Sequence, residues 1–177
     1  MKRLLDLSHR RQARVWLDAA PPAAFTPASA LRAWLKPAIA LSPARGVAGL
    51  EIHVPQGDKG VYALLGAEFR GHPTLKGLEV VVPVNDEGPP FPHPVTRQLE
   101  AVNVGLPATY AEAVLTGVAR AVDAGQAPVD GALTFRWAAY SASNSSASIF
   151  EQAGAIVVRL LTLASVQSDD SIRALFD

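Results

Sequence analysis

The sequence contains no cysteine, few aromatic residues and no excess of charge of either sign. Without cysteine, disulfide scaffolds, thiolate metal sites and cysteine nucleophiles are excluded. Aromatic residues make up 7% of the 177 residues and charged residues 18%, with 16 basic against 16 acidic side chains. This balance argues against a dedicated nucleic-acid-binding coat, which would be strongly basic. The hydrophobic fraction of 49% is enough to fill the core of one domain of ordinary size.

No segment has the pattern of a targeting or membrane-spanning sequence. Charges occur at Lys2, Arg3 and Asp6, too early for the apolar run of a signal peptide. The longest apolar run lies near the C-terminal end and is interrupted by Arg159, so it is too short to cross a bilayer. We therefore expect a cytoplasmic protein without a membrane partner.

The common signatures of catalysis and cofactor binding are missing too. The sequence has no GxxxxGK[ST] phosphate loop, no GxGxxG after a strand and no GxSxG nucleophile turn. A zinc site needs roughly three or four converging ligands. The histidines instead lie in separate segments, without i, i+4 spacing on a helix: His9, His53, His72 and His93. We therefore expect no metal, no cofactor and no catalytic residue.

The balanced total charge hides an asymmetry along the chain. Residues 1–45 hold eight bases and two acids, a net charge of +6, and the remainder carries −6. A basic leading segment can contact phosphates or an acidic partner. More often such a run is a solvated helix face or an arm folded against its own acidic body, so the asymmetry is a weak indication of a partner.

The first part of the chain is expected to be a basic helical arm over residues 1–40, preceding a domain over residues 41–177. Thr26-Pro27 has a capping hydroxyl followed by proline, which is typical of a helix start. Apolar residues at helical spacing and a proline stop come next: Leu31, Trp34, Leu35 and Pro37. The pattern therefore predicts a short helix in this arm.

From about residue 47 the apolar period changes to two. Apolar and polar residues alternate over 50–54, with Glu51 and His53 at the polar positions, which predicts a half-buried strand. Four prolines in 85–96 predict an exposed loop or edge. Further apolar runs at 61–65 and 78–84, and the alternation of Leu133, Phe135 and Trp137, also predict strands.

The second half of the chain has clear helical stripes. Apolar residues at helical spacing predict helices over 107–124 and 145–165. Gly154 inside the second helix costs roughly 1 kcal/mol against alanine, which indicates close packing of another backbone there. Strands followed by helix, strand and helix favour an α+β architecture with the sheet covered on one face.

One segment is unusually rich in small hydroxyl residues, from Ser141 to Ser148, between a predicted strand and a predicted helix. Such residues at a helix N-terminus can surround an anion with backbone N–H groups. They can also simply cap the helix. Ser148 and Glu151 have capping-box spacing, and Asn144 to Ser146 can each satisfy an unpaired N–H group.

Residues 105–165 contain a series of residues in an order and spacing that characterise one family. The first helix opens Gly-Leu-Pro and continues with tyrosine, Ala-Val, glycine, alanine and a closing glycine, namely Gly105, Leu106, Pro107, Tyr110, Ala113, Val114, Gly117, Ala121 and Gly125. Beyond it come Pro128, Val129, Asp130, Asn144, Ser145, Ser146, Phe150, Ala153 and Gly154. This spacing resembles domain IV of the translocation factors, elongation factor G and its relatives.

The resemblance implies a particular fold. It is a two-layer α+β sandwich in which a four-stranded sheet carries two helices on one face, shared with the GHMP small-molecule kinases. The four strands would lie near 47–54 or 61–70 and at 77–84, 99–104 and 132–142. It includes a left-handed β-α-β crossover, expected between Val104 and Leu133, against the strong right-handed preference of parallel connections.

The resemblance also implies a site at the tip of the domain. The tip loop would contain Tyr140, Ser141, Ser143, Asn144, Ser145 and Ser146, supported by Arg45 or Arg70. The register of the other tip loop stays open between 45–49 and 70–77. The family's tip histidine falls on Ser141, and its acidic residues become Ala142 and Asn144. The GTPase domain of the family is missing from the sequence.

Three functions are consistent with these observations. The first is a non-catalytic domain that associates with the ribosome or RNA through its tip, since polar contacts to RNA remain available there. The second is a protein-interaction module that kept the fold without binding RNA. The third is a small-molecule kinase, because Ser145-Ser146-Ala147 is similar to part of the GHMP phosphate loop, although residues 138–148 contain no glycine.

Overall fold

The computed structural model describes residues 1–7, 10–39, 41–56, 59–72, 74–96, 99, 101–164 and 169–176. The described residues form both strands and helices, which confirms the predicted α+β class. The strands are β1 (Lys2–Asp6), β2 (Gln12–Leu17), β3 (Ser29–Leu35), β4 (Val47–Gln56), β5 (Lys59–Gly71), β6 (Leu78–Val84), β7 (Val102–Val104) and β8 (Gly131–Ser141). The helices are α1 (Ala108–Asp123), α2 (Ala147–Thr162) and α3 (Asp169–Arg173).

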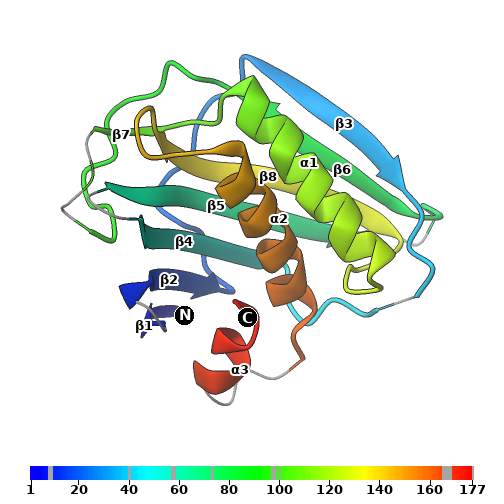
Figure 1. Ribbon diagram of the computed structural model, residues 1–177. Coiled ribbons are helices and arrows are strands. Elements are labelled where there is room, and N and C mark those ends of the chain that lie inside the picture. Colours follow the sequence, from blue (N-terminus) through cyan, green and yellow to red (C-terminus); the bar gives the residue numbers. More distant parts are fainter. Residues whose placement is uncertain are drawn as a thin grey trace.

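The strands form one open sheet in the order β1-β2-β4-β5-β8-β6-β3, with β7 pairing to the end of β8. Helices α1 and α2 lie side by side on one face of it (Figure 1). The expected count of four strands is wrong, because the described residues form an 8-stranded sheet. The two alternative segments near 47–54 and 61–70 are both strands, β4 and β5, and they pair with each other as a hairpin.

The expected helical arm over residues 1–40 is also wrong, since this segment contributes β1, β2 and β3 to the sheet. The helix predicted after Thr26-Pro27 is β3, which pairs with β6 over its whole length. The reason is a second periodicity in the same residues. Leu31, Ala33 and Leu35 alternate and pack as partly buried side chains against the main core, so a strand buries this segment better than a helix would.

The connection through α1 joins a different pair of strands from the one expected. β7 runs antiparallel to β8, pairing Val102 with Ser141, so Val104 and Leu133 do not lie on parallel neighbours. The parallel pair is β6 and β8, in register from Leu78 opposite Gly131. The crossover therefore leads from β6 through α1 to β8, and β7 is an added antiparallel segment along the way.

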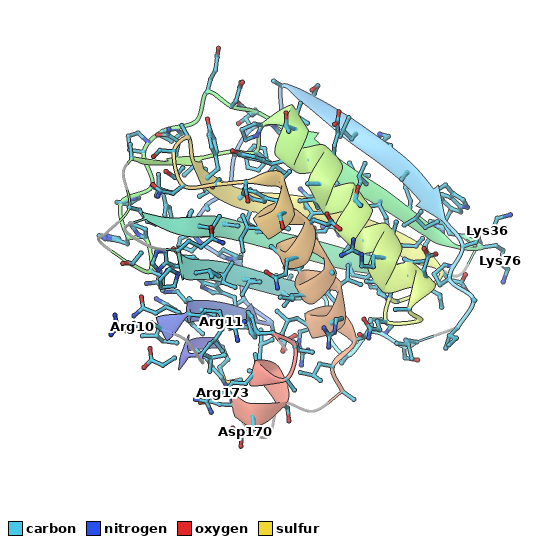
Figure 2. The ribbon with its side chains drawn as sticks, in the orientation of Figure 1. Arg10, Arg11, Lys36, Lys76, Asp170 and Arg173 are labelled. Carbon is cyan, nitrogen blue, oxygen red and sulfur yellow. The ribbon has the colours of Figure 1, made fainter. Side chains whose placement is uncertain are left out.

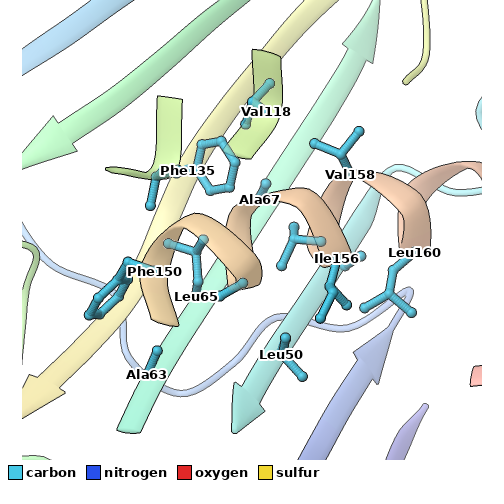
Figure 3. Packing of buried hydrophobic residues seen from close by; sticks show 14 of the residues in the cluster. Leu50, Ala63, Leu65, Ala67, Val118, Phe135, Phe150, Ile156, Val158 and Leu160 are labelled. Atoms are coloured by element: carbon cyan, nitrogen blue, oxygen red, sulfur yellow. The ribbon is translucent and has the colours of Figure 1, made fainter. Parts of the chain in front are cut away.

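The main core lies between the helices and the sheet. Figure 3 shows Phe150, Ile156 and Leu160 of α2 close to side chains of β4 and β5 such as Leu50 and Leu65. The two helices touch at glycine. A Cβ at Gly117 would lie 2.0 Å from the carbonyl oxygen of Glu151, and one at Gly154 would lie 2.9 Å from that of Val114. The close backbone approach predicted at Gly154 is confirmed.

The opposite face of the sheet has a second, smaller apolar cluster. Residues 19–25, the proline-rich segment 85–96 and β7 cover this face, and Phe91 of the proline-rich segment is buried. The other members are Trp16, Ala23, Tyr62, Leu64, Val102, Val104 and Ala139. The proline-rich segment is therefore a cover for the sheet, although much of its own outer surface is exposed.

Candidate functional site

The predicted tip loop connects β8 to α2 and is held by hydrogen bonds within the protein. Ser145 Oγ accepts a bond from the Ser141 amide at 3.0 Å and donates to the carbonyl of Tyr62 at 2.6 Å. Asn144 Nδ2 donates to the carbonyl of Gly60, and the Asn144 carbonyl accepts from the Tyr62 amide. Ser141 and Asn144 are buried, whereas Ser143 is exposed. Most of the loop therefore faces β5 rather than solvent.

Ser146 caps helix α2, with its Oγ accepting from the Ile149 amide at 3.4 Å. The predicted capping box of Ser148 and Glu151 is wrong, because both residues lie inside the helix, which begins at Ala147. Glu151 instead forms an ion pair with Arg120 of α1. The serine-rich segment thus supplies the cap two residues earlier than its spacing suggests.

Tyr140 lies in an aromatic cluster at the base of the tip. Its ring meets Tyr110 edge to face at 6.1 Å, and Tyr110 stacks on Phe150 at 4.8 Å. Its hydroxyl donates to the carbonyl of Asp86 at 2.7 Å, and burial raises the pKa of Tyr140 above 10.0. This side chain anchors the 85–104 segment and is not presented as a contact for a partner.

Neither supporting arginine lies at the tip. Arg45 is nearly buried and donates to the carbonyl of Leu160 at the end of α2, with Asp18 at 3.7 Å. The 16-residue helix separates it from the tip, about 24 Å at 1.5 Å per residue. Arg70 pairs with Glu68 and lies opposite Ala132, at the start of β8, whereas the tip follows its end. The structure therefore keeps the predicted tip-loop residues together but places neither arginine beside them.

The basic N-terminal segment folds against its own acidic body. Arg3 pairs with Asp169 at 2.7 Å, and Arg11 donates to the carbonyl of Phe176. Arg32 pairs with Glu79 at 2.9 Å. Figure 2 shows Arg10 and Arg11 at the same end of the molecule as Asp170 and Arg173. Of the two readings of the charge asymmetry, the structure favours internal neutralisation.

A cluster of buried ionisable groups, not anticipated from the sequence, lies beneath the proline-rich segment. The Glu51 carboxylate has no exposed surface and accepts from the Tyr62 hydroxyl at 2.9 Å and the Val95 amide at 2.7 Å. Its Oε2 lies 2.9 Å from Arg14 Nη1 as an ion pair, and Arg14 also donates to the carbonyl of His93. The cluster ties β2, β4, β5 and the cover together.

Burial shifts the pKa values of the ionisable groups in and next to this cluster. Burial raises the pKa of Glu51 above 4.5, although Arg14, the Val95 amide and Tyr62 oppose the shift. Burial and the nearby carboxylate raise the pKa of Tyr62 well above 10.0, and burial lowers the pKa of His53 below 6.5. The strand alternation had placed Glu51 and His53 at solvent-facing positions. Glu51 is buried because the segment around Val95 lies on it, and Phe91 between prolines is the one local signal of that cover.

An open groove of about 580 Å³ lies on the helix-free face, over β3, β6 and β8. Val81 and Pro83 of β6 and Thr134 of β8 line it. Phe25, Trp137, Arg32 and Arg136 also line it. The groove offers apolar surface next to positive charge.

Within the described residues no group of histidine, aspartate and glutamate side chains has the arrangement of a metal site. Likewise, none of the helices described is both long and apolar enough to cross a membrane. A comparison with models of known protein families finds no match, and a search of curated proteins finds no relative. Arguments about function therefore rest on the chain's own geometry.

Proposed function

We propose that this chain is a non-catalytic interaction domain with the fold of translation factor domain IV, and that its partner is a protein rather than RNA. The observation that carries the proposal is the inward hydrogen bonding of the tip loop. Ser141, Asn144 and Ser145 use their polar groups on one another and on β5. Little of the loop remains to bind a nucleic acid, whose recognition depends on exposed donors, aromatic faces and cations.

The fold assignment is supported by the connection between β6 and β8. In Figure 1 the helices stand in front of the sheet, and both strands run opposite to the β3 arrow. If Figure 1 is rotated so that β6 and β8 point upward, β6 lies to the right of β8. The chain then runs from β6 through α1, which lies in front of the sheet, to β8 on the left. That sense is left-handed, which is rare among parallel connections, and it is the sense that the resemblance implies.

The RNA-associated alternative loses its supporting charges. Arg45 contacts the end of α2, and Arg3, Arg14 and Arg32 each pair with a carboxylate of this chain. RNA affinity derives largely from unpaired cations near phosphates. These four arginines are therefore not available to RNA phosphates.

The kinase alternative loses its phosphate-binding donors. A phosphate loop presents free backbone N–H groups. Here the amides of Asn144 and Ser145 bond to the carbonyl of Ser141, and the Ser141 amide bonds to Ser145 Oγ. We therefore expect no rise in melting temperature on adding ATP and Mg²⁺.

Co-sedimentation with ribosomes tests the proposal. At about 50 mM salt, where phosphate contacts are strongest, we expect the chain to stay in the supernatant. Pelleting that falls as salt rises, and that is weakened by a Ser143→Ala change at the exposed tip position, would overturn the proposal in favour of RNA binding. A charge-reversed Arg10→Glu variant serves as the control for non-specific adhesion.

A further inference from the structure

Strand β3 forms one free edge of the sheet. Among the described residues it pairs only with β6, over seven regular positions from Ser29 opposite Val84 to Leu35 opposite Leu78. Figure 1 shows β3 at the rim, with no strand on its outer side. An edge strand leaves alternate N–H and C=O groups without a partner, which makes it a template for a further strand.

This edge lacks the usual protection against strand addition. Proline, bulges and several charged side chains normally blunt an edge. β3 pairs with β6 without interruption and has a single charged residue, Arg32. The nearest prolines, Pro27 and Pro37, lie outside the strand. The opposite edge, β1, is shorter, carries Lys2, Arg3 and Asp6, and is tied to α3 by the Arg3–Asp169 ion pair.

The two faces of β3 differ in chemistry. On the helix side, Leu31, Ala33 and Leu35 are only partly buried against the main core. On the other side, Arg32 is 65% and Trp34 47% exposed, and Arg32 lines the groove over β6 and β8. A strand added here would meet apolar side chains on one face and a cation beside an aromatic ring on the other.

Positive charge is concentrated at the C-terminal end of this edge. Figure 2 shows Lys36 and Lys76 extending from the same end of the molecule, beyond β3 and before β6. Within the part of the chain that the structure describes, neither ammonium group has a hydrogen bond or ion pair, and Glu79 pairs with Arg32. The edge therefore carries three cations against one carboxylate, which disfavours pairing with a second copy and favours an acidic partner.

We propose that β3 is the docking edge for an extended segment of another protein in which apolar and acidic residues alternate. The segment adds antiparallel or parallel to β3, so that main-chain hydrogen bonds supply affinity and alternate side chains supply specificity. Its apolar residues continue the surface of Leu31, Ala33 and Leu35, and its carboxylates lie beside Arg32 and Lys36. This inference deepens the proposed interaction function and rests on it.

Peptide binding to the intact chain tests the proposal. The probe is a fluorescein-labelled seven-residue peptide in which valine and glutamate alternate, measured by anisotropy. A peptide of the same composition with the valines and glutamates in separate blocks is the matched probe. We expect the alternating peptide to bind about tenfold more tightly than the block peptide, and more weakly at high salt. Backbone amide shifts should centre on β3 and β6.

Charge reversal at the edge is the second arm of the experiment. A Lys36→Glu/Lys76→Glu double variant should weaken binding about tenfold, since position 36 would repel the adjacent carboxylate of the added segment and position 76 would no longer add positive charge to this end of the edge. The matched control is Arg10→Glu/Arg173→Glu, which makes the same change in charge at the opposite end of the sheet and should leave affinity within about twofold.

Three results would overturn the proposal: equal affinity of the two peptides, amide shifts centred away from β3, or self-association through β3 that the peptide displaces. If the peptide fails and ribosome binding at the tip is also absent, only the assignment of the edge fails. If the peptide fails and the chain pellets with ribosomes through its tip, the proposed interaction function fails as well.

Discussion

At the scale of single residues, Glu51 shows how a cover changes the chemistry of a strand. The carboxylate occupies a position that alternation assigns to solvent, yet the segment around Val95 closes over it. A buried carboxylate costs free energy unless it is paired and hydrogen-bonded. Arg14, Tyr62 and the Val95 amide supply those partners, so the group persists inside the protein.

A Glu51→Gln variant should alter the pH dependence of stability. Because burial raises the pKa of Glu51 above 4.5, the folded state holds this proton to higher pH than the unfolded chain does. The stabilisation that this proton provides is therefore complete below the pKa of Glu51 in the unfolded chain. It is lost as pH rises through the pKa of Glu51 in the folded protein. We expect the native protein to lose free energy of unfolding relative to the glutamine variant over that interval, measured by urea unfolding at a series of pH values. Parallel pH profiles would contradict this.

The tip loop gives a second prediction at the residue scale. Ser145→Ala removes the acceptor of the Ser141 amide and the donor to the Tyr62 carbonyl, and should cost about 1–3 kcal/mol of unfolding free energy. Ser143→Ala, at the exposed position of the same loop, should change stability by no more than about 0.5 kcal/mol. Urea denaturation of both variants measures the difference. Equal effects would show that the loop contributes little to folding.

At the scale of elements, the contact between α1 and α2 depends on glycine. A Gly117→Ala variant gains up to about 1 kcal/mol in helix propensity, but its Cβ would lie 2.0 Å from the carbonyl oxygen of Glu151. We expect a net loss of about 1–3 kcal/mol from overpacking, measured by thermal and urea unfolding. The neighbouring Thr116→Ala, on the exposed side of α1, should be nearly neutral. A stabilised Gly117→Ala protein would mean that the helices can move apart freely.

The elements differ in how far the sequence alone predicts them. β4, β6, β8, α1 and α2 are predicted within a few residues, because their apolar periods are long and bounded by glycine or proline. β3 is not predicted as a strand, because its apolar residues fit two patterns. Leu31, Trp34 and Leu35 have helical spacing, whereas Leu31, Ala33 and Leu35 alternate as in a strand. Its pairing with β6, some fifty residues away along the chain, decides between them, and no local pattern records that partner.

The candidate site is less predictable than the fold, for a related reason. Spacing along the chain gives the residues of the tip loop correctly but not the direction of their side chains. Ser145 and Asn144 turn toward Tyr62 and Gly60, residues of another strand. Arg45 and Arg70 were placed beside the tip, whereas the length of α2 and the register of β5 against β8 set them far from it.

At the scale of the whole molecule, the two ends of the chain support each other. Ile172, Leu175 and Phe176 are buried in the main core, and Arg3 and Arg11 of the N-terminal strands and loop contact Asp169 and Phe176. Figure 1 shows both chain ends beside β1 and α3. The last residues are therefore part of the folded unit.

Truncation after residue 168 should unfold the protein or lower its melting temperature sharply. Three large buried side chains would be lost, each contributing about 1.5–3 kcal/mol. Their sum is comparable with the stability of an ordinary domain, about 5–15 kcal/mol. Circular dichroism melting measures the effect, with Asp170→Ala, whose side chain is 86% exposed, as a near-neutral control. A truncated chain that melts like the full one would show that α3 is dispensable.

The central position of β8 has a consequence for synthesis. β8 lies between β5 and β6, and these two halves of the sheet are joined through it. It is also the last strand of the chain, so a nascent chain can pair β1, β2, β4 and β5 in one unit and β3 with β6 in another before Gly131 emerges. Until then, β5 and β6 each present an open, apolar edge. A chain stalled at that stage would be exposed to aggregation that the finished protein avoids.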